Sequence, residues 1–445
     1  MKKMLSVLSV AVAASMFSAG ASQAADLLGV YRDAIGYDAQ FASAKAALVA
    51  GREKLPQGRA GLLPTIGFSA STAWNDYDTT TRTTPTAEFL RKYNSNGWSV
   101  NLSQPLFRWQ NWASYKQSEL AVAQAEMQYG LAKQDLIVRV AQAYFDVLLA
   151  QESLASAQAQ KTAIGEQLAS AKRNFEVGTA TITDTHEAQA RYDLTTAQEI
   201  AADNDLQVKR QTLGTIIGRE PEALKSLRHG LEIGRPQPDD IFKWVESAEQ
   251  GSLAVQLGQA SLEIATREID KQRAGHYPTL DLVASRGRSS ATSSTLTTGS
   301  GSDSDATTIG LQLAIPIFAG GTTMSRDREA VALHDKASAD LDNARRTAAL
   351  AARQAYLGVT SGLAQVKALE QALVSSQSAL DSNKLGYEVG VRINIDVLNA
   401  QQQLYSTRRD LAKARLDTLA AQLKLKAAAG TLGEDDVAAV NVLLE

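Results

Sequence analysis

The sequence predicts a mainly α-helical chain, built from two copies of one unit, with a smaller part that has the pattern of a transmembrane β-barrel. Three observations predict this fold class: two long runs without proline, four short segments in which apolar and polar residues alternate, and an internal repeat. The chain has 445 residues, with 44% apolar and 21% charged residues, as in ordinary folded proteins. Its formal net charge of −3 argues against binding to nucleic acid, which requires a basic surface.

The first residues have the pattern of a secretory signal peptide. Two lysines precede an apolar run at residues 5–17, and SQA at 22–24 forms a candidate cleavage site. The apolar run is shorter than the stretch of about 18 residues that a membrane-spanning helix requires. We therefore assign residues 1–24 to the signal peptide of an exported chain. The sequence contains no cysteine, which excludes disulfide bonds and a lipid anchor on an N-terminal cysteine.

The sequence repeats itself along almost its whole length. RAGLLPTIGF at 59–68 matches RAGHYPTLDL at 273–282, and FEVG at 175–178 matches YEVG at 387–390. The matches keep their order, so they indicate a duplicated unit. After the signal peptide, the expected divisions are a first repeat at 25–220, a linker at 221–238, a second repeat at 239–430 and a C-terminal tail at 431–445.

Long helices are expected in both copies. Residues 106–220 and 317–445 contain no proline, and a proline inside a helix costs about 3 kcal/mol or more. Both runs are rich in Ala, Leu, Gln, Glu, Lys and Arg, which favour helices. We expect a helix from Trp112 to Arg173, roughly 90 Å long at about 1.5 Å per residue, followed by a return helix at 184–217. The second copy predicts the same pair at about 325–385 and 396–429.

The apolar residues of the first long helix lie on two faces. One stripe has the coiled-coil spacing and consists of Leu131, Val138 and Phe145. The other stripe consists of Leu136, Val140, Tyr144 and Val147. Two stripes suit a helix that has a neighbour on each side, as in the wall of a cylinder. Periodicity alone does not distinguish such a wall from a long helical bundle.

Four segments alternate apolar residues with small or polar ones, which is the period of a half-buried strand. We expect strands at about 64–76, 96–106, 278–288 and 307–318. Long polar loops are expected at 75–96 and 287–306, between the two strands of each copy. About ten residues with apolar side chains on one face is also the pattern of a strand in an outer-membrane barrel.

Four strands cannot close a membrane barrel alone. A sheet in lipid must close on itself, because lipid offers no partners to the hydrogen-bonding groups of a free edge. Known barrels begin at about eight strands. Either these strands form a soluble sheet, or several chains contribute to one barrel. The signal peptide, the alternation and the long helices favour the second interpretation, in which the chain is an oligomer around a shared pore.

Two phrases carry a family resemblance: YEVGVRINIDVLNAQQQLY at 387–405 and its echo FEVGTATITDTHEAQARYD at 175–193. QPLFRW at 104–109 and IPIFAGG at 315–321 add to it. With these motifs the sequence resembles the TolC family of outer-membrane channel proteins. The resemblance implies a homotrimer in which four strands per chain close one 12-stranded β-barrel, continuous with a long α-helical barrel in the periplasm. The linker and the tail would then form an equatorial belt.

The function that the resemblance implies is a passive exit duct of a tripartite exporter. Its partners would be a periplasmic adaptor (membrane fusion) protein, an inner-membrane pump of the ABC or proton-driven kind, and outer-membrane lipid. Drug efflux and type I secretion of polypeptides both remain open, because the pump selects the substrate.

The two matching turns are the candidate functional sites, and local structure accounts for part of their sequence. Gly178 and Gly390 suit the positive φ that ends a helix. Asp184 and Asp396 suit N-caps of the return helices, and Glu187 would complete a pair that resembles a capping box. Capping gives no role to a tyrosine and an arginine that the second turn contains.

The resemblance implies that these residues hold the periplasmic end closed. Tyr387 would hydrogen-bond Asp184 across the two hairpins, and Arg392 would reach the Thr183–Asp184 region of a neighbouring subunit. Asp396 would face the lumen, where threefold symmetry makes it a ring of carboxylates that attracts cations. The next ring position is Asn399, so cation binding should be weaker than with two acidic rings. The expected adaptor-docking tips are Val177, Gly178, Thr179, Val389, Gly390 and Val391.

No enzyme motif is present in the sequence. The four histidines, at 186, 229, 276 and 334, do not have the spacing of a metal site, and there is no nucleophile elbow, P-loop or dinucleotide fingerprint. We expect no catalytic residue, metal or cofactor. The alternative from another class is a secreted or surface-attached coiled-coil structural protein, such as an adhesin.

Overall fold

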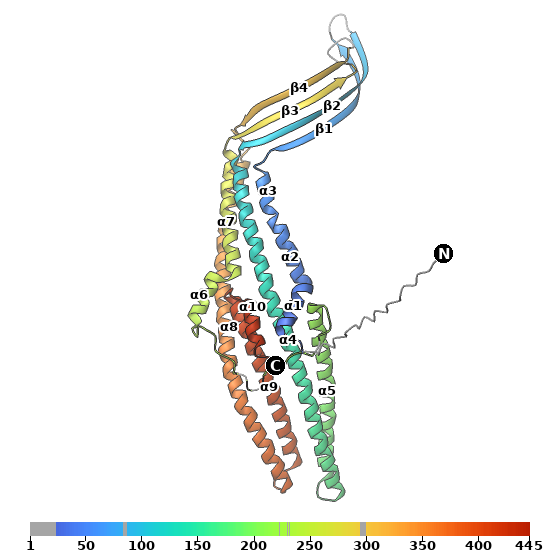
Figure 1. The fold of residues 1–445 in the computed structure, drawn as a ribbon, viewed down its shortest axis with the longest axis vertical. Helices are drawn as coiled ribbons and strands as arrows, with labels where there is room; N and C mark the ends of the chain where they lie inside the picture. The colour runs from blue at the N-terminus through green and yellow to red at the C-terminus, as the bar shows by residue number, and fades with distance from the viewer. Residues whose placement is uncertain (1–23, 83–86, 222, 229, 231, 294–299) are drawn as a thin grey trace, which may run out of the picture.

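The computed structural model describes residues 24–82, 87–221, 223–228, 230, 232–293 and 300–445 (Figure 1). The predicted signal peptide, apart from Ala24, lies outside these residues. In chain order the elements are α1 (Leu27–Tyr37), α2 (Ala39–Arg52), α3 (Lys54–Ala60), β1 (Thr65–Thr81), β2 (Ala87–Phe107), α4 (Trp109–Glu176), α5 (Ile182–Ile217), α6 (Ile241–Gly251), α7 (Leu253–Arg273), a 3₁₀ turn (Ala274–His276), β3 (Thr279–Ala291), β4 (Ser302–Ala314), α8 (Thr322–Glu388), α9 (Asn394–Ala428) and α10 (Glu434–Asn441).

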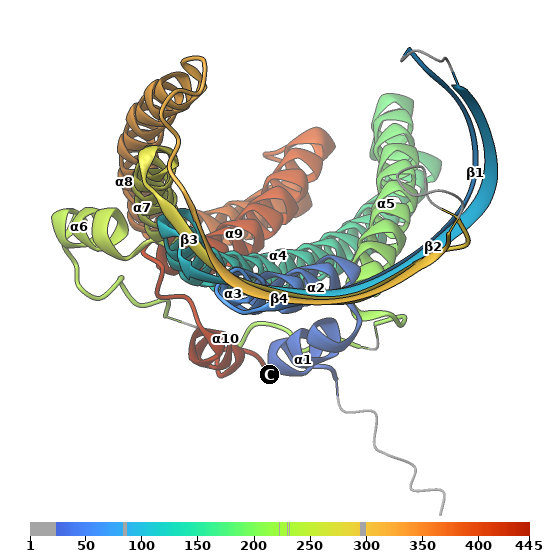
Figure 2. The ribbon, with the colours of Figure 1, turned by 90° about the horizontal axis from the view of Figure 1, so that it is seen from above.

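The chain is elongated, with a sheet at one end and two helical turns at the other (Figure 1). Seen from above, the long helices and the sheet form one curved wall, and α1, α6 and α10 lie on its convex side (Figure 2). α4 packs against α5, α7 and α9, so it has neighbours on more than one face. This arrangement agrees with the two apolar stripes of the first long helix. Among the described residues, no helix is both long and apolar enough to cross a membrane.

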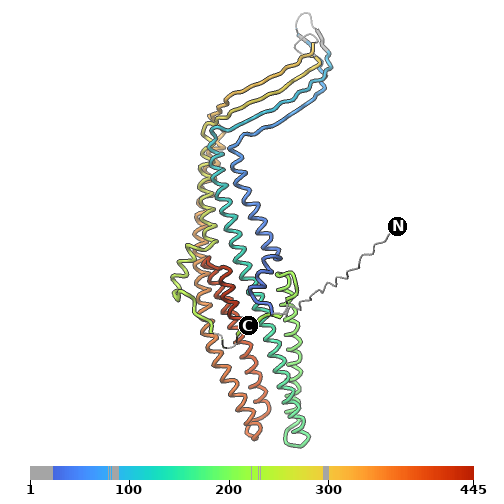
Figure 3. The backbone as a smooth tube through the Cα atoms, in the orientation of Figure 1, coloured from blue at the N-terminus to red at the C-terminus, as the bar shows by residue number. Residues whose placement is uncertain are grey.

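Each copy of the repeat contains a very long helix and a shorter one that folds back beside it (Figure 3). α4 has 68 residues and α8 has 67, which makes each helix roughly 100 Å long. α5 and α9 have 36 and 35 residues. Both return helices begin two residues earlier than the sequence predicted, at Ile182 and Asn394, because neither aspartate is the N-cap.

The four strands form one antiparallel sheet in the order β1-β2-β3-β4. β1 and β2 are longer than expected, because most of the predicted polar loop between them is paired as strand, from Asn75 with Tyr93 outward. The loop prediction rested on polar composition, but cross-strand contacts stabilise this extension. Lys92 lies 3.0 Å from the Asp76 carboxylate, and the rings of Tyr77 and Tyr93 stack at 5.9 Å.

The second pair of strands also differs from the prediction. β3 ends at Ala291, three residues later than expected, and β4 is shifted toward the N-terminus, from Ser302 to Ala314. The polar residues of β4 pair with β3, as Asp303 does with Ser290, so polarity did not prevent strand formation. β4 ends before Pro316, which has no N–H to donate to a ladder.

The two faces of the sheet differ in chemistry. Directly opposed residues share a face, so the register places Ile66 beside Leu102 and Ala284 beside Ile309 on one apolar face. Ile66 and Ile309 are 70% and 74% exposed there. The other face carries small polar residues, among them Ser69 and Ser99, whose hydroxyls lie 2.9 Å apart. Such a one-sided apolar face suits contact with lipid.

An ion pair fastens the sheet to the helices. Arg108, between β2 and α4, donates from Nε to Asp281 Oδ1 at 2.8 Å and from Nη2 to Oδ2 at 2.5 Å. Asp281 lies on β3, and its side chain is 8% exposed, whereas that of Arg108 is 42% exposed. The bond therefore joins the first copy of the repeat to the second at the point where strands give way to helices.

The largest core lies at mid-height, where α1 and α10 pack against α4. Leu27, Val30 and Tyr31 of α1 are buried, together with Val437 of α10. The buried Tyr144 donates to the carbonyl oxygens of Lys225 at 2.8 Å and Ala25 at 3.2 Å. Short β-bridges join Ala25 to Leu224 and Leu227 to Leu444. The linker and the tail, including the unpredicted helix α10, thus lie together beside the wall (Figure 1).

Candidate functional site at the two helical turns

The two turns have nearly the same backbone. Gly178 and Gly390 have φ values of 78° and 80°, a conformation that favours glycine. After each glycine the chain bonds back to the end of the helix: Thr179 N donates to Asn174 O at 2.8 Å, and Val391 N donates to Gly386 O at 2.9 Å. The two copies of the repeat therefore share the shape of the turn.

The tips of the turns are exposed. Val177 is 73% exposed, Val389 is 64% exposed and Val391 is 76% exposed. Gly178 and Gly390 have open space where a Cβ would lie, so only their φ values restrict substitution. Each turn thus presents apolar side chains that this chain itself does not cover.

The starts of the two return helices differ. Thr181 caps α5: its hydroxyl accepts from Asp184 N at 3.2 Å, and the Asp184 carboxylate accepts from Thr181 N at 3.0 Å. Asp184 is therefore the partner of the cap in a capping box, and the predicted cap roles of Asp184 and Glu187 were wrong. In the second copy Ile393 occupies the equivalent position and, among the described residues, no side chain caps α9. Asp396 was likewise wrongly predicted as an N-cap.

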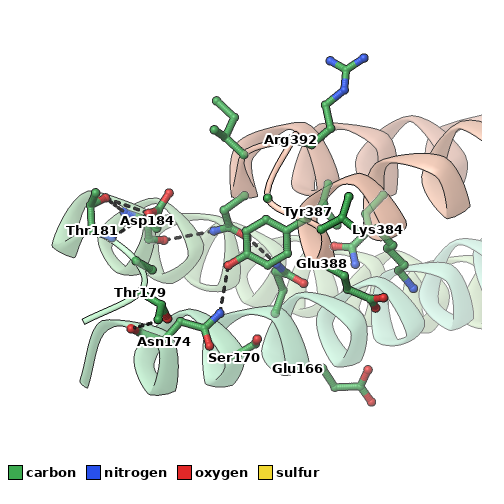
Figure 4. A pocket seen from close by; sticks show the side chains of 18 of the residues that line it. Glu166, Ser170, Asn174, Thr179, Thr181, Asp184, Lys384, Tyr387, Glu388 and Arg392 are labelled. Carbon is green, nitrogen blue, oxygen red and sulfur yellow. Dashed lines mark hydrogen bonds between the residues drawn. The ribbon is translucent and has the colours of Figure 1, made fainter. Parts of the chain in front are cut away.

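Tyr387 joins the two hairpins, but through a partner other than the implied one. Asn174 Nδ2 donates to the Tyr387 hydroxyl at 3.3 Å, from α4 to α8 (Figure 4). The implied hydrogen bond between Tyr387 and Asp184 is not the one formed in this structure. The Asp184 carboxylate instead accepts from the amide and the hydroxyl of Thr181. Thr183 lies next to Asp184 and is exposed.

Arg392 points away from Asn174 and Asp184 (Figure 4). Its Nη1 lies 3.6 Å from Asp396 Oδ2, and the two side chains are 59% and 34% exposed. A solvent-accessible ion pair of this kind contributes at most about 1 kcal/mol. Arg392 can therefore exchange this contact for one outside the chain, and the Asp396 carboxylate is not committed to a helix cap.

Several residues that link the hairpins were not predicted from the sequence. Asn174 is the partner of Tyr387, and Gln167 donates to Asn394. Arg191 donates to Asn399. One signal was available for Asn394: the equivalent residue in the first copy is Ile182, so a polar residue replaces an apolar one. Hydrogen bonds between residues about 210 positions apart cannot be recognised from one sequence.

A cleft of about 950 Å³ lies between the two turns, lined by residues of both hairpins. Tyr387, Asp184 and Arg392 line it, as do Asn394 and Gln401. Asn394 is 0% exposed and Gln401 is 2% exposed. Among the described residues, no group of three or more His, Cys, Asp or Glu could hold a metal ion. The cleft is thus a polar joint between the two hairpins.

A curved helical wall that carries, at the end opposite the two turns, a sheet with one apolar face has the form of one section of a membrane channel. The family model described as outer membrane efflux protein matches residues 30–219 and 244–431, one match for each copy of the repeat. The chain belongs to this outer membrane efflux protein family.

Curated relatives agree over nearly the full length. Outer membrane protein TolC of Vibrio cholerae is 33% identical over 445 residues, which cover 100% of this chain and 99% of the relative. The proteases secretion protein PrtF of Dickeya chrysanthemi is 32% identical, over 94% of this chain and 91% of the relative. The alkaline protease secretion protein AprF of Pseudomonas aeruginosa is 33% identical, over 92% and 85%.

Solved structures confirm the fold. The outer membrane protein VceC of Vibrio cholerae has a TM-score of 0.76 at 18% identity, over 91% of this chain and 96% of that one. The outer membrane channel CmeC of Campylobacter jejuni has a TM-score of 0.78 at 17% identity, over 94% and 90%.

This chain is an outer-membrane exit duct for efflux or type I secretion, with its helical part in the periplasm. The predicted function and location are thereby confirmed, against the alternative of a coiled-coil structural protein.

Proposed function

We propose that three copies of this chain close one passive duct, with a 12-stranded barrel in the outer membrane. The four-stranded sheet supports this proposal, because within the described part of the chain the outer edges of β1 and β4 have no neighbouring strand. An edge in lipid needs a partner, and the nearest candidate is the opposite edge of another copy. The curvature of the wall supports closure around an axis on its concave side (Figure 2).

We propose further that the second hairpin carries the gate at the periplasmic end. Tyr387 holds α8 to α4 through Asn174, and Arg392 reaches the Thr183–Asp184 region of the neighbouring subunit. The direction of Arg392, away from Asn174 and Asp184 of its own chain, is the observation that carries this assignment (Figure 4). Opening then requires that the tyrosine bond and the arginine contact break in each subunit.

Asp396 forms the proposed cation ring of the lumen. The missing side-chain cap on α9, among the described residues, leaves its carboxylate available, and its contact with Arg392 is accessible to solvent and weak. Asn399 contributes no charge, and its Oδ1 accepts from Arg191 at 3.0 Å. Cation binding at the ring therefore rests on Asp396 alone.

The exposed valines of the two turns are the proposed docking tips for a periplasmic adaptor, together with Gly178, Thr179 and Gly390. An inner-membrane pump, of the ABC or proton-driven kind, would supply the energy, since a passive duct supplies none. Relatives named for protease secretion and for efflux both resemble this chain, so the pump decides the cargo.

The test is single-channel recording in planar bilayers. Tyr387→Phe combined with Arg392→Ser should raise the conductance, because both proposed closing contacts are lost. Ser170→Ala is a matched control in the same cleft. An unchanged conductance in the double variant would show that the gate lies elsewhere. A parent protein that forms no trimer and no pore would overturn the duct itself.

A further inference from the structure

Away from the tips, Arg191 binds two residues of the other hairpin. Arg191 of α5 donates from Nη1 to Gln402 Oε1 at 2.7 Å and from Nη2 to Asn399 Oδ1 at 3.0 Å. The two acceptors are three residues apart, so they lie on the same face of α9. A guanidinium holds its donors in a fixed planar fork, and hydrogen bonds from a charged donor are stronger than neutral ones.

A second contact fixes the first residue of α9. Asn394 is fully buried, and its Oδ1 accepts from Gln167 Nε2 of α4 at 2.5 Å. Its Nδ2 donates to the backbone oxygen of Asp184 on α5 at 3.3 Å. One side chain thus connects three helices. Because α9 has no side-chain cap of its own among the described residues, its start depends on contacts with the first hairpin.

We propose that Arg191 and Asn394 form an intrachain latch that holds α9 against the first hairpin while the duct is closed. The inference rests on the proposed gate and adds positioning residues to it. The tip contact of Arg392 needs a neighbouring subunit, whereas the latch lies entirely within one chain.

The two copies of the repeat do not share the latch residues. The second copy has the neutral Gln403 at the position equivalent to Arg191, and the first copy has Ile182 at the position equivalent to Asn394. The first hairpin thus supplies a charge that its counterpart lacks, and the second hairpin supplies a polar residue where its counterpart is apolar. The shared turn shape of the two copies needs neither residue, so the latch has a role apart from the fold of a single hairpin.

The latch makes opening depend on a buried amide and on two charge-assisted hydrogen bonds. Separation of the hairpins would leave Asn394 and Gln167 to find new partners, and Arg191 would lose both of its acceptors on α9. Loss of such bonds should change the ratio of open to closed duct about tenfold.

The test uses the full-length protein in planar bilayers. Arg191→Met keeps the apolar length of the side chain and removes its donors, so the open fraction should rise about tenfold over the parent. Asn394→Ile, which copies the residue of the first repeat, should act in the same direction. Arg173→Met is the control, because Arg173 is an exposed arginine near the tip of α4 that does not line the cleft between the hairpins.

Variants of Asn399 and Gln402, the two acceptors of Arg191, test the proposal even if the Arg191 variant fails to assemble. Asn399→Leu with Gln402→Leu should raise the open fraction as Arg191→Met does, and the three changes together should add nothing further. Combination with Tyr387→Phe and Arg392→Ser should give a larger effect than either set alone.

Two results would overturn the latch. In the first, the donor and acceptor variants both keep the open fraction of the parent and of Arg173→Met. In the second, neither set forms pores, which would show that these residues hold the fold rather than the gate. The proposed gate fails separately, when the Tyr387 and Arg392 variant leaves the conductance unchanged.

Discussion

Replacement of Arg108 by methionine should weaken the joint between the sheet and the helices. Arg108 binds both oxygens of Asp281, whose side chain is only 8% exposed. The change would leave a nearly buried carboxylate without its partner. Removing one member of a fully buried pair costs about 3–5 kcal/mol, whereas exposed pairs contribute at most about 1 kcal/mol. Because the Arg108 side chain is 42% exposed, we expect an intermediate loss of about 2 kcal/mol per chain.

The assay is thermal unfolding of the purified protein in detergent, followed by circular dichroism and by gel mobility of heated and unheated samples. The double variant Arg108→Met with Asp281→Leu removes the unpaired charge, so it should recover much of the lost stability. Arg346→Met is a matched control, since Arg346 pairs with Asp342 on an exposed face of α8. Equal stability of the parent, the single variant and the control would refute the reasoning.

Three further predictions concern an ion pair between Asp38 and Arg139 of α4, and the two turns. The hydrogen bond from Arg139 holds the pKa of Asp38 in the folded protein below its usual value of 3.8. The stability that this pair contributes should therefore be present above pH 3.8, and it should be lost as the pH falls through the pKa of Asp38 in the folded protein. Asp38→Asn should make the stability less dependent on pH in this acid range. Thr181→Ala should lower the free energy of unfolding by about 1 kcal/mol and speed amide hydrogen exchange in the first turn of α5, because the cap is lost. Ile393→Ala should cause no such loss at the start of α9, because Ile393 does not cap that helix. Asp396→Ala should reduce block of the pore by divalent cations added on the periplasmic side, and equal block in parent and variant would place the ring elsewhere.

The sequence was sufficient for the architecture because the architecture depends on patterns. The absence of proline between Pro105 and Pro221, and again after Pro316, predicted the two long helices, and strict alternation predicted four strands. The strand ends were less predictable. Polar residues such as Asp76 and Asp303 resemble loop residues until their neighbours across the sheet are known.

The candidate site was predicted only in part for a similar reason. Gly178 and Gly390 are visible because positive φ is a local property. The hydrogen-bond partner of Tyr387 could not be predicted, because both Asn174 and Asp184 of the first hairpin could bond to its hydroxyl. In the structure Asp184 bonds to Thr181, and Asn174 bonds to Tyr387. The partner that forms the bond depends on the local competition for each oxygen, and composition and periodicity do not contain that information.

The two turns repeat one backbone shape with different side chains, and this has a consequence for binding stoichiometry. In a ring of three chains there would be six turns of the same shape, which alternate between a capped kind with Thr181 and an uncapped kind with Ile393. A partner that recognises the backbone and the equivalent valines Val177 and Val389 would find six equivalent places. A partner that recognises the distinguishing side chains would find three. The number of partner molecules bound per ring therefore reports which features of the turn are recognised.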